Sequence, residues 1–246
     1  MWSEGARGLA GLPFRIMRAT CLAPARLVAS ALALTLAGGC GRNHVDDFPL
    51  SVGFQPLESL SASALPPAPS GTDLHPQALG AIVAPAEAGH FTSHARGYVH
   101  APLARVYQAL HDPASSYLHN SGGGTRLDGP PVMDVEPSFP VSFRVRYSNA
   151  TVIGDVKFDL TYRAGPLQGT EAAPAVIGQR YQKTWGNSNI RVMSGSLVAT
   201  AVAGAPDVTE VEMIAWLDAT TQHQSDCDGT LRDLFGDLVA VVAALP

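Results

Sequence analysis

The end of this 246-residue chain carries the feature that most restricts its fold, an apolar pattern of helical period over residues 231–245. Apolar side chains recur at spacings of three and four, which places them on one side of an α-helix; these are Leu231, Leu234, Phe235, Leu238, Val239, Val242 and Leu245. Asp226 or Asp228 can cap the start of this helix, and Arg232 and Asp237 are expected to face outward. A helix with one apolar side must cover another element, and the candidate in this chain is an antiparallel sheet.

Alternating apolar and polar residues in the middle of the chain predict a hairpin with one buried and one solvated face. The alternation runs from Phe143 to Tyr147 and again from Val156 to Tyr162. Ser148-Asn149 lies between the two runs, and this dipeptide favours a turn. One apolar face and one polar face are typical of an antiparallel sheet that is packed on one side only.

Similar patterns predict the rest of the sheet and one short helix. Further strands are expected at residues 90–99, 180–185, 190–202 and 208–218, and a helix at 103–110. Gly165 to Ala175 is rich in proline and glycine and is expected to be a loop. Gly195 inside a predicted strand indicates a bulge or a bend.

Two local motifs and the order of the predicted elements resemble a known superfamily. The first motif runs from Ala95 to Pro113 and places a strand, Ala101-Pro102, a helix with Val106-Tyr107, and then Asp112-Pro113 in succession. The second is Asp233–Leu238 in the final helix. Residues 90–245 thereby resemble the START-like superfamily, also called SRPBCC or polyketide cyclase/pollen-allergen-like. The resemblance implies an α+β helix-grip fold, in which a curved antiparallel sheet wraps around a long C-terminal helix.

The resemblance also implies a function, because members of this superfamily mostly hold apolar ligands between sheet and helix, while some are cyclases or hydrolases. The residues expected to line such a cavity are Phe143, Tyr147, Phe158, Tyr162, Trp185, Met193, Met213, Leu234 and Leu238. Each of them can equally be an ordinary core residue. The prediction is a domain that binds a lipid or other apolar small molecule without catalysis. The alternatives are an enzyme of the cyclase or hydrolase type and an interaction module with a filled core.

The N-terminal region predicts export and lipidation. The apolar stretch Leu27–Leu36 follows a leader with four arginines and is about ten residues long, too short to span a bilayer. Leu34–Cys40 resembles the lipobox of bacterial lipoproteins, which implies a signal peptide over 1–39 that starts at Met1 or Met17, and a lipid on Cys40. A Pro-rich disordered tether over 40–88 would then join the membrane to a folded domain over 89–246. The implied location is the periplasmic side of the outer membrane. The alternative is an ordinary signal peptide and a plain thiol at Cys40.

Composition and motifs exclude several other functions. Residues 1–39 contain four of the 16 basic and one of the 21 acidic residues, so the processed chain has a net charge of −8. An acidic chain without a basic cluster is unsuited to nucleic acid. His90, His94 and His100 lack the partners that a metal site needs, so neither a metal nor another cofactor is expected. No serine lies in a nucleophile-elbow motif, and Cys227 is the one cysteine left after Cys40, so no catalytic residue is predicted.

Overall fold

The computed structural model describes residues 65–85, 89–118, 125–151, 154–220 and 222–246. The signal peptide, Cys40 and residues 41–64 and 86–88 of the expected tether lie outside the described residues. Within the described part of the chain, no helix is both long enough and apolar enough to cross a bilayer.

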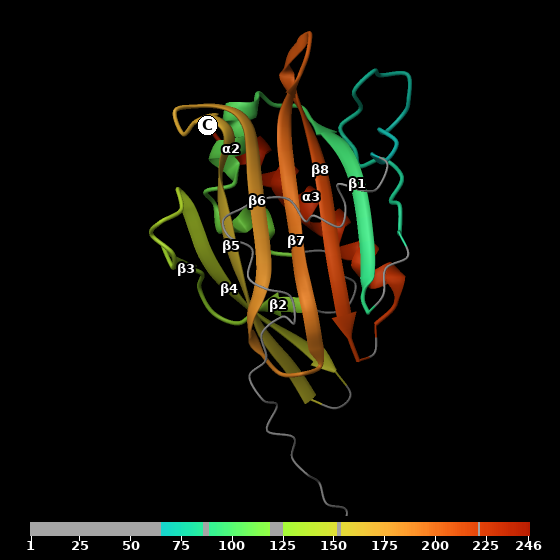
Figure 1. Cartoon of the computed structure of the whole chain (residues 1–246), viewed down its shortest axis with the longest axis vertical. Coiled ribbons are helices and arrows are strands. Elements are labelled where there is room, and N and C mark those ends of the chain that lie inside the picture. The colour runs from blue at the N-terminus through green and yellow to red at the C-terminus, as the bar shows by residue number, and fades with distance from the viewer. Residues whose placement is uncertain (1–64, 86–88, 119–124, 152–153, 221) are drawn as a thin grey trace, which may run out of the picture. The chain divides into compact units, whose positions relative to one another are not determined.

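One antiparallel sheet of eight strands organises the described residues, in the order β1-β8-β7-β6-β5-β4-β2, with β3 also paired to β4 (Figure 1). The strands are β1 (Phe91–Val99), β2 (Thr125–Leu127), β3 (Val132–Met133), β4 (Val141–Thr151), β5 (Gly154–Thr170), β6 (Ala173–Gly186), β7 (Ile190–Val202) and β8 (Ala205–Ala219). Strands β4 to β8 follow one another as a meander, and β1 pairs with β8. The sheet is strongly curved, as the twist of long antiparallel strands favours (Figure 1).

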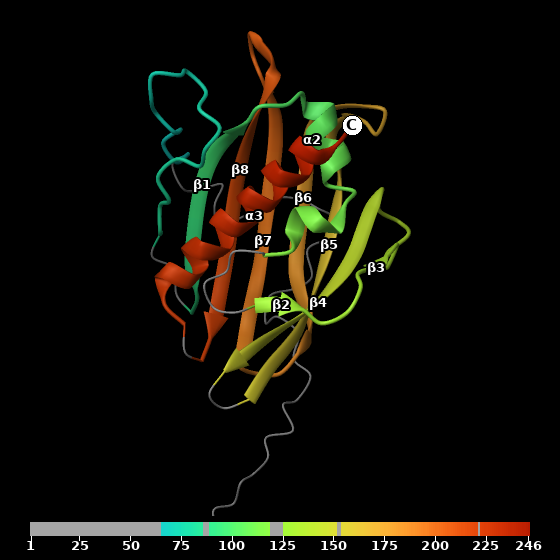
Figure 2. The ribbon, with the colours of Figure 1, turned by 180° about the vertical axis from the view of Figure 1, so that it is seen from behind.

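The described helices cover one face of the sheet, and the expected helix-grip architecture is thereby confirmed (Figure 2). These helices are α2 (Leu103–Ala109), the 3₁₀ helix η1 (Pro113–Ser116) and α3 (Gln224–Ala244). The apolar side of α3 is buried at Leu231, Leu234, Leu238 and Val242, as its period predicts. The helix starts at Gln224, where the Asp226 carboxylate accepts a hydrogen bond of 2.8 Å from the backbone N–H of the N-cap residue.

The turn expected at Ser148-Asn149 and the loop expected at Gly165 to Ala175 are wrong. The β4–β5 and β5–β6 hairpins both extend further than the local sequence indicates. Ser148 pairs with Lys157 and Asn149 with Val156, so this dipeptide continues β4. Residues 165–170 likewise continue β5, and β6 begins at Ala173, with register shifts near Pro166 and Gln168. Cross-strand pairing overrides the turn preference of these residues, and the local irregularities accommodate proline and glycine.

Gly195 has a different role from the expected bulge. It pairs in regular register with Tyr181 on β6 and with Ala215 on β8, the other neighbour of β7. The aromatic ring of Tyr181 lies directly over Gly195, in the space where a Cβ atom would stand. The glycine is therefore needed for close packing between two adjacent strands.

The segment at residues 78–83, which falls within the expected tether, packs along the free edge of β1. The backbone N–H of Gly80 donates to the carbonyl of Arg96, and Val83 and His94 exchange two hydrogen bonds, all at 2.8 Å. Residues on the N-terminal side of residue 89 thus take part in packing against the sheet. This segment also covers an edge strand that would otherwise expose its hydrogen-bonding groups.

Arg105 of α2 fastens the C-terminal end of α3. Its guanidinium donates hydrogen bonds to the carbonyls of Val242 at 3.1 Å, Leu245 at 2.6 Å and Pro246 at 3.2 Å. The last carbonyls of a helix lack intrahelical partners and carry partial negative charge, which a cation there stabilises. This contact ties the two helices together above the sheet.

Candidate functional site

Eight of the nine residues predicted to line a cavity lie in the core between the sheet and α3. These eight, all buried, are Phe143, Tyr147, Phe158, Tyr162, Met193, Met213, Leu234 and Leu238. Ring centroids are 4.8 Å apart for Phe143 and Tyr162, and 5.3 Å apart for Tyr147 and Phe158, both in stacked geometry. The concave face of β4 and β5 is therefore an aromatic wall.

The aromatic wall has a polar centre formed by two tyrosine hydroxyls and η1. The hydroxyl of Tyr147 donates to the carbonyl of Ser116 at 2.5 Å, and that of Tyr162 lies 3.3 Å from the same oxygen. The two hydroxyl oxygens are 3.2 Å apart. Burial raises the pKa of both tyrosines, so both remain protonated and available as donors.

Two carboxylates of α3 are buried on this side of the helix, and the expectation that Asp237 faces outward is wrong. Asp237 is only 4% exposed and Asp233 only 6%. The charge of Asp237 further raises the pKa of Tyr147 and Tyr162, which places this carboxylate near their hydroxyls. The reason for the error is that η1 packs on this flank of α3 and buries a side that the helical pattern assigned to solvent.

Asp233 is the more unusual of the two carboxylates. Its buried Oδ2 atom has no hydrogen-bond partner in the described part of the protein. Burial raises its pKa to about 6, and the negative charge of Asp237 adds to the effect, while Arg232 opposes it. An unpartnered carboxylate in such surroundings is costly and is a common mark of a functional site.

A groove of about 350 Å³ opens between η1 and the C-terminal half of α3. Its lining is mainly apolar and consists of Asp112, Ala114, Asp237, Ala240, Val241, Ala244, Leu245 and Pro246. Asp237 is the lining residue nearest the start of α3, and Asp233 lies one turn beyond it on the same flank. None of the nine residues predicted as cavity walls lines this groove, which we call the η1–α3 groove.

Trp185, the ninth predicted wall residue, lies on the opposite, convex face of the sheet. It is half-buried in an outer groove of about 370 Å³, and the guanidinium carbon of Arg146 stands 4.5 Å from its ring centroid. A register shift between Asp159 and Leu160 pairs Trp185 with Asp159, which points outward. Trp185 is therefore not part of an interior wall.

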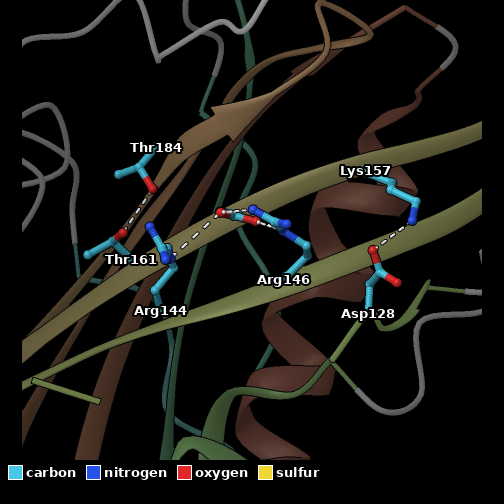
Figure 3. Close-up of polar contacts among 7 residues, drawn as sticks. Asp128, Arg144, Arg146, Lys157, Thr161 and Thr184 are labelled. Carbon is cyan, nitrogen blue, oxygen red and sulfur yellow. Dashed lines mark hydrogen bonds and ion pairs between the residues drawn. The ribbon is translucent and has the colours of Figure 1, made fainter. Parts of the chain in front are cut away.

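Charged and polar side chains line the outer groove that contains Trp185. Figure 3 shows the contacts of Arg144, Arg146 and the two threonines of this groove. Arg146 holds both carboxylate oxygens of the buried Asp159, at 2.7 and 2.9 Å, and the Nε atom of Arg144 lies 3.7 Å from the same carboxylate. The hydroxyls of Thr161 on β5 and Thr184 on β6 form a hydrogen bond of 2.8 Å. The bidentate pairing of Arg146 with Asp159 stabilises the convex face of the sheet, and the charged side chains keep this face polar.

Lys183 is a fully buried cation that sequence analysis did not single out. It pairs in the sheet with the core residue Leu160, and its Nζ atom donates to the carbonyls of Asn187, at 3.1 Å, and Ile190. Asn187 lies in the connection between β6 and β7, and Ile190 is the first residue of β7. The lysine thus supplies a donor to backbone carbonyls at the start of β7 and in the connection before it.

The described residues offer neither a metal centre nor an activated thiol. They contain no group of three or more His, Cys, Asp or Glu side chains placed to hold a metal ion. Burial raises the pKa of the Cys227 thiol to about 12, and this sulfur donates weakly to the carbonyls of Phe91 and Ala215. A thiol of this kind stays protonated and is a poor nucleophile.

The polar groups of the site were missed by sequence reasoning, although one signal was present. Asp233 and Asp237 are four residues apart in a predicted helix, so they share one flank. The second half of the site, η1, lies more than a hundred residues earlier in the chain. No local pattern connects the two segments.

Neither a protein family nor a curated protein matches this chain by sequence. Solved structures do match. TTHA0849 from Thermus thermophilus is 15% identical, with 62% of this chain and 97% of that chain covered and a TM-score of 0.43. The Zhui aromatase/cyclase from Streptomyces sp. R1128 is 15% identical, with 62% and 92% covered and a TM-score of 0.36. The human StarD13 lipid transfer and protein localization domain is 9% identical, with 66% and 87% covered and a TM-score of 0.39.

Proposed function

We propose that this domain binds an apolar small molecule or lipid in the η1–α3 groove, without catalysis. The observation that supports the proposal is the groove itself, whose volume of about 350 Å³ lies within the range of small-molecule sites. Its walls are mainly alanine, valine, leucine and proline side chains, and two carboxylates, Asp112 and Asp237, also line it. A mainly apolar hollow with a few polar groups suits a ligand that is largely hydrocarbon.

We further propose that the protein works at the bacterial cell envelope, on a lipid anchor at Cys40. The basic leader, the short apolar stretch and the small residues before Cys40 support this location. Several acyl chains on one cysteine hold a protein firmly, since each buried CH₂ contributes about 0.8 kcal/mol. The anchored domain would then meet apolar ligands where membranes supply them.

The binding proposal is tested with the full chain and a fluorescent apolar probe, N-phenyl-1-naphthylamine. Ala244 lines the groove, and Ala243, its exposed neighbour on the same helix, does not. We expect Ala244→Trp to fill the groove and weaken probe binding by about tenfold or more, and the matched variant Ala243→Trp to change it by less than about twofold. Absence of probe binding to the unmodified protein, or equal binding by both variants, would overturn the proposal.

The anchor is tested by fractionating cells that express the full chain. We expect the unmodified protein in the membrane fraction and Cys40→Ser in the soluble fraction of the envelope. A Cys40→Ser protein that stays with the membrane would contradict lipidation at this residue.

A second candidate function is an enzyme of the cyclase or hydrolase type. The observation that favours it is the inward polar cluster of Tyr147, Tyr162 and Asp237, together with a carboxyl at Asp233 whose pKa of about 6 suits proton transfer near neutrality. Turnover of a bound apolar ligand, followed by mass spectrometry and abolished in Asp233→Asn, would favour the enzyme over the binding protein.

A further inference from the structure

The Oδ2 atom of the Asp233 carboxylate lacks a partner within the part of the chain that the structure describes, although the residue is buried. Asp233 is 6% exposed, its Oδ2 atom is buried, and no donor among the described residues reaches that atom. A buried polar atom of this kind is rare in folded proteins, and each one calls for an explanation. A ligand that supplies the missing donor is such an explanation.

The surroundings of Asp233 favour a cationic donor over a neutral one. Asp237 stands one helical turn away on the same flank, and both residues are buried, so two carboxylates repel each other in poorly solvated surroundings. The neighbouring cation Arg232 is exposed on another side of α3. A positive group between the two carboxylates would stabilise both of them.

The η1–α3 groove leads an apolar molecule toward this pair. Its apolar lining comes mainly from the last two turns of α3 and the two residues that follow them, and its carboxylates are Asp112 and Asp237. A molecule with its hydrocarbon part along Val241 and Ala244 can place its polar end next to Asp237, and Asp233 lies one helical turn from Asp237. The arrangement matches an amphiphile with its charge at one end.

We infer that the ligand of this domain carries a protonated amine, which Asp233 and Asp237 bind while its hydrocarbon part occupies the η1–α3 groove. This inference rests on the proposed binding function and names the chemical class of its ligand. Charge-assisted hydrogen bonds to carboxylates are roughly twice as strong as neutral ones, so the amine is the group that the site selects.

The test compares two probes of equal chain length, decylamine and decanol, in displacement of N-phenyl-1-naphthylamine from the full chain at pH 7.5. We expect decylamine to bind about tenfold more tightly than decanol, because only the amine supplies a charged donor to the buried Asp233 carboxylate. In Asp233→Asn we expect the preference to fall below about threefold, because decylamine loses its charged acceptor. The control Asp155→Asn removes an exposed carboxylate of β5 and should keep the full preference.

The outcomes separate this inference from the proposed function. If neither probe displaces N-phenyl-1-naphthylamine, the binding function itself fails. If decylamine and decanol bind equally, or if Asp233→Asn keeps the preference for the amine, the domain binds apolar molecules and the inference about the amine is wrong. Circular dichroism of Asp233→Asn at the same pH establishes that the variant is folded, as expected for a substitution that removes a buried charge.

Discussion

The substitution Asp233→Asn should stabilise the protein at neutral pH. The asparagine side chain has nearly the same shape as aspartate but carries no charge, so it removes the cost of a buried carboxylate without opening a cavity. Burial and the charge of Asp237 raise the pKa of Asp233 from 3.8 to about 6 in the folded protein. One pKa unit corresponds to 1.36 kcal/mol, so the shift amounts to about 3 kcal/mol of unfolding free energy.

The sign of the effect follows from proton binding. Between pH 3.8 and about 6 the folded state binds more protons at Asp233 than the unfolded state, so stability falls as pH rises through this window. Above about pH 6 the carboxylate is charged in both states and the full penalty applies. Below pH 3.8 it is neutral in both states and the penalty disappears.

The assay is urea denaturation followed by circular dichroism at one-unit steps from pH 4 to pH 8. We expect Asp233→Asn to exceed the unmodified protein by about 2–3 kcal/mol at pH 7 and above, and the difference to shrink toward zero near pH 4. The control Asp155→Asn removes an exposed carboxylate and should change stability by less than about 0.5 kcal/mol at every pH. A variant that is less stable than the unmodified protein at pH 7, or a difference independent of pH, would refute the reasoning.

Three further predictions concern contacts that stabilise the fold, each checked by urea denaturation. Arg105→Ala should destabilise the protein by about 2 kcal/mol, because three carbonyls at the end of α3 lose a charged donor; a loss below about 0.5 kcal/mol would contradict this role. Gly195→Ala should cost about 1–3 kcal/mol, since its methyl group meets the ring of Tyr181, and unchanged stability would show that the ring does not lie there. Lys183→Met should lose about 1–3 kcal/mol, because the carbonyls of Asn187 and Ile190 lose the hydrogen bonds from the ammonium; a variant as stable as the unmodified protein would argue that water replaces the ammonium.

Periodicity in the sequence was a sound guide wherever one pattern covers a whole element. The spacing of Leu231, Leu234, Leu238 and Val242 predicted the buried side of α3, and the alternation around Phe143–Tyr147 predicted an inward aromatic face. These patterns succeed because burial on one face is a local property of a helix or strand. The same patterns do not indicate where a strand ends. In both long hairpins, residues that favour turns are paired with the neighbouring strand and continue the sheet.

The sequence by itself determined the α+β class and the long final helix, since each depends on neighbouring residues alone, and the export signal around Cys40 stays a prediction of the sequence. Only the tertiary structure decided that Asp233 and Asp237 are buried, that Trp185 faces the convex side and that the groove lies between η1 and α3. The physical reason is that these features need contacts between segments far apart in the chain. Such contacts bury the side chain of Asp233 and thereby raise its pKa, and no local sequence pattern predicts them.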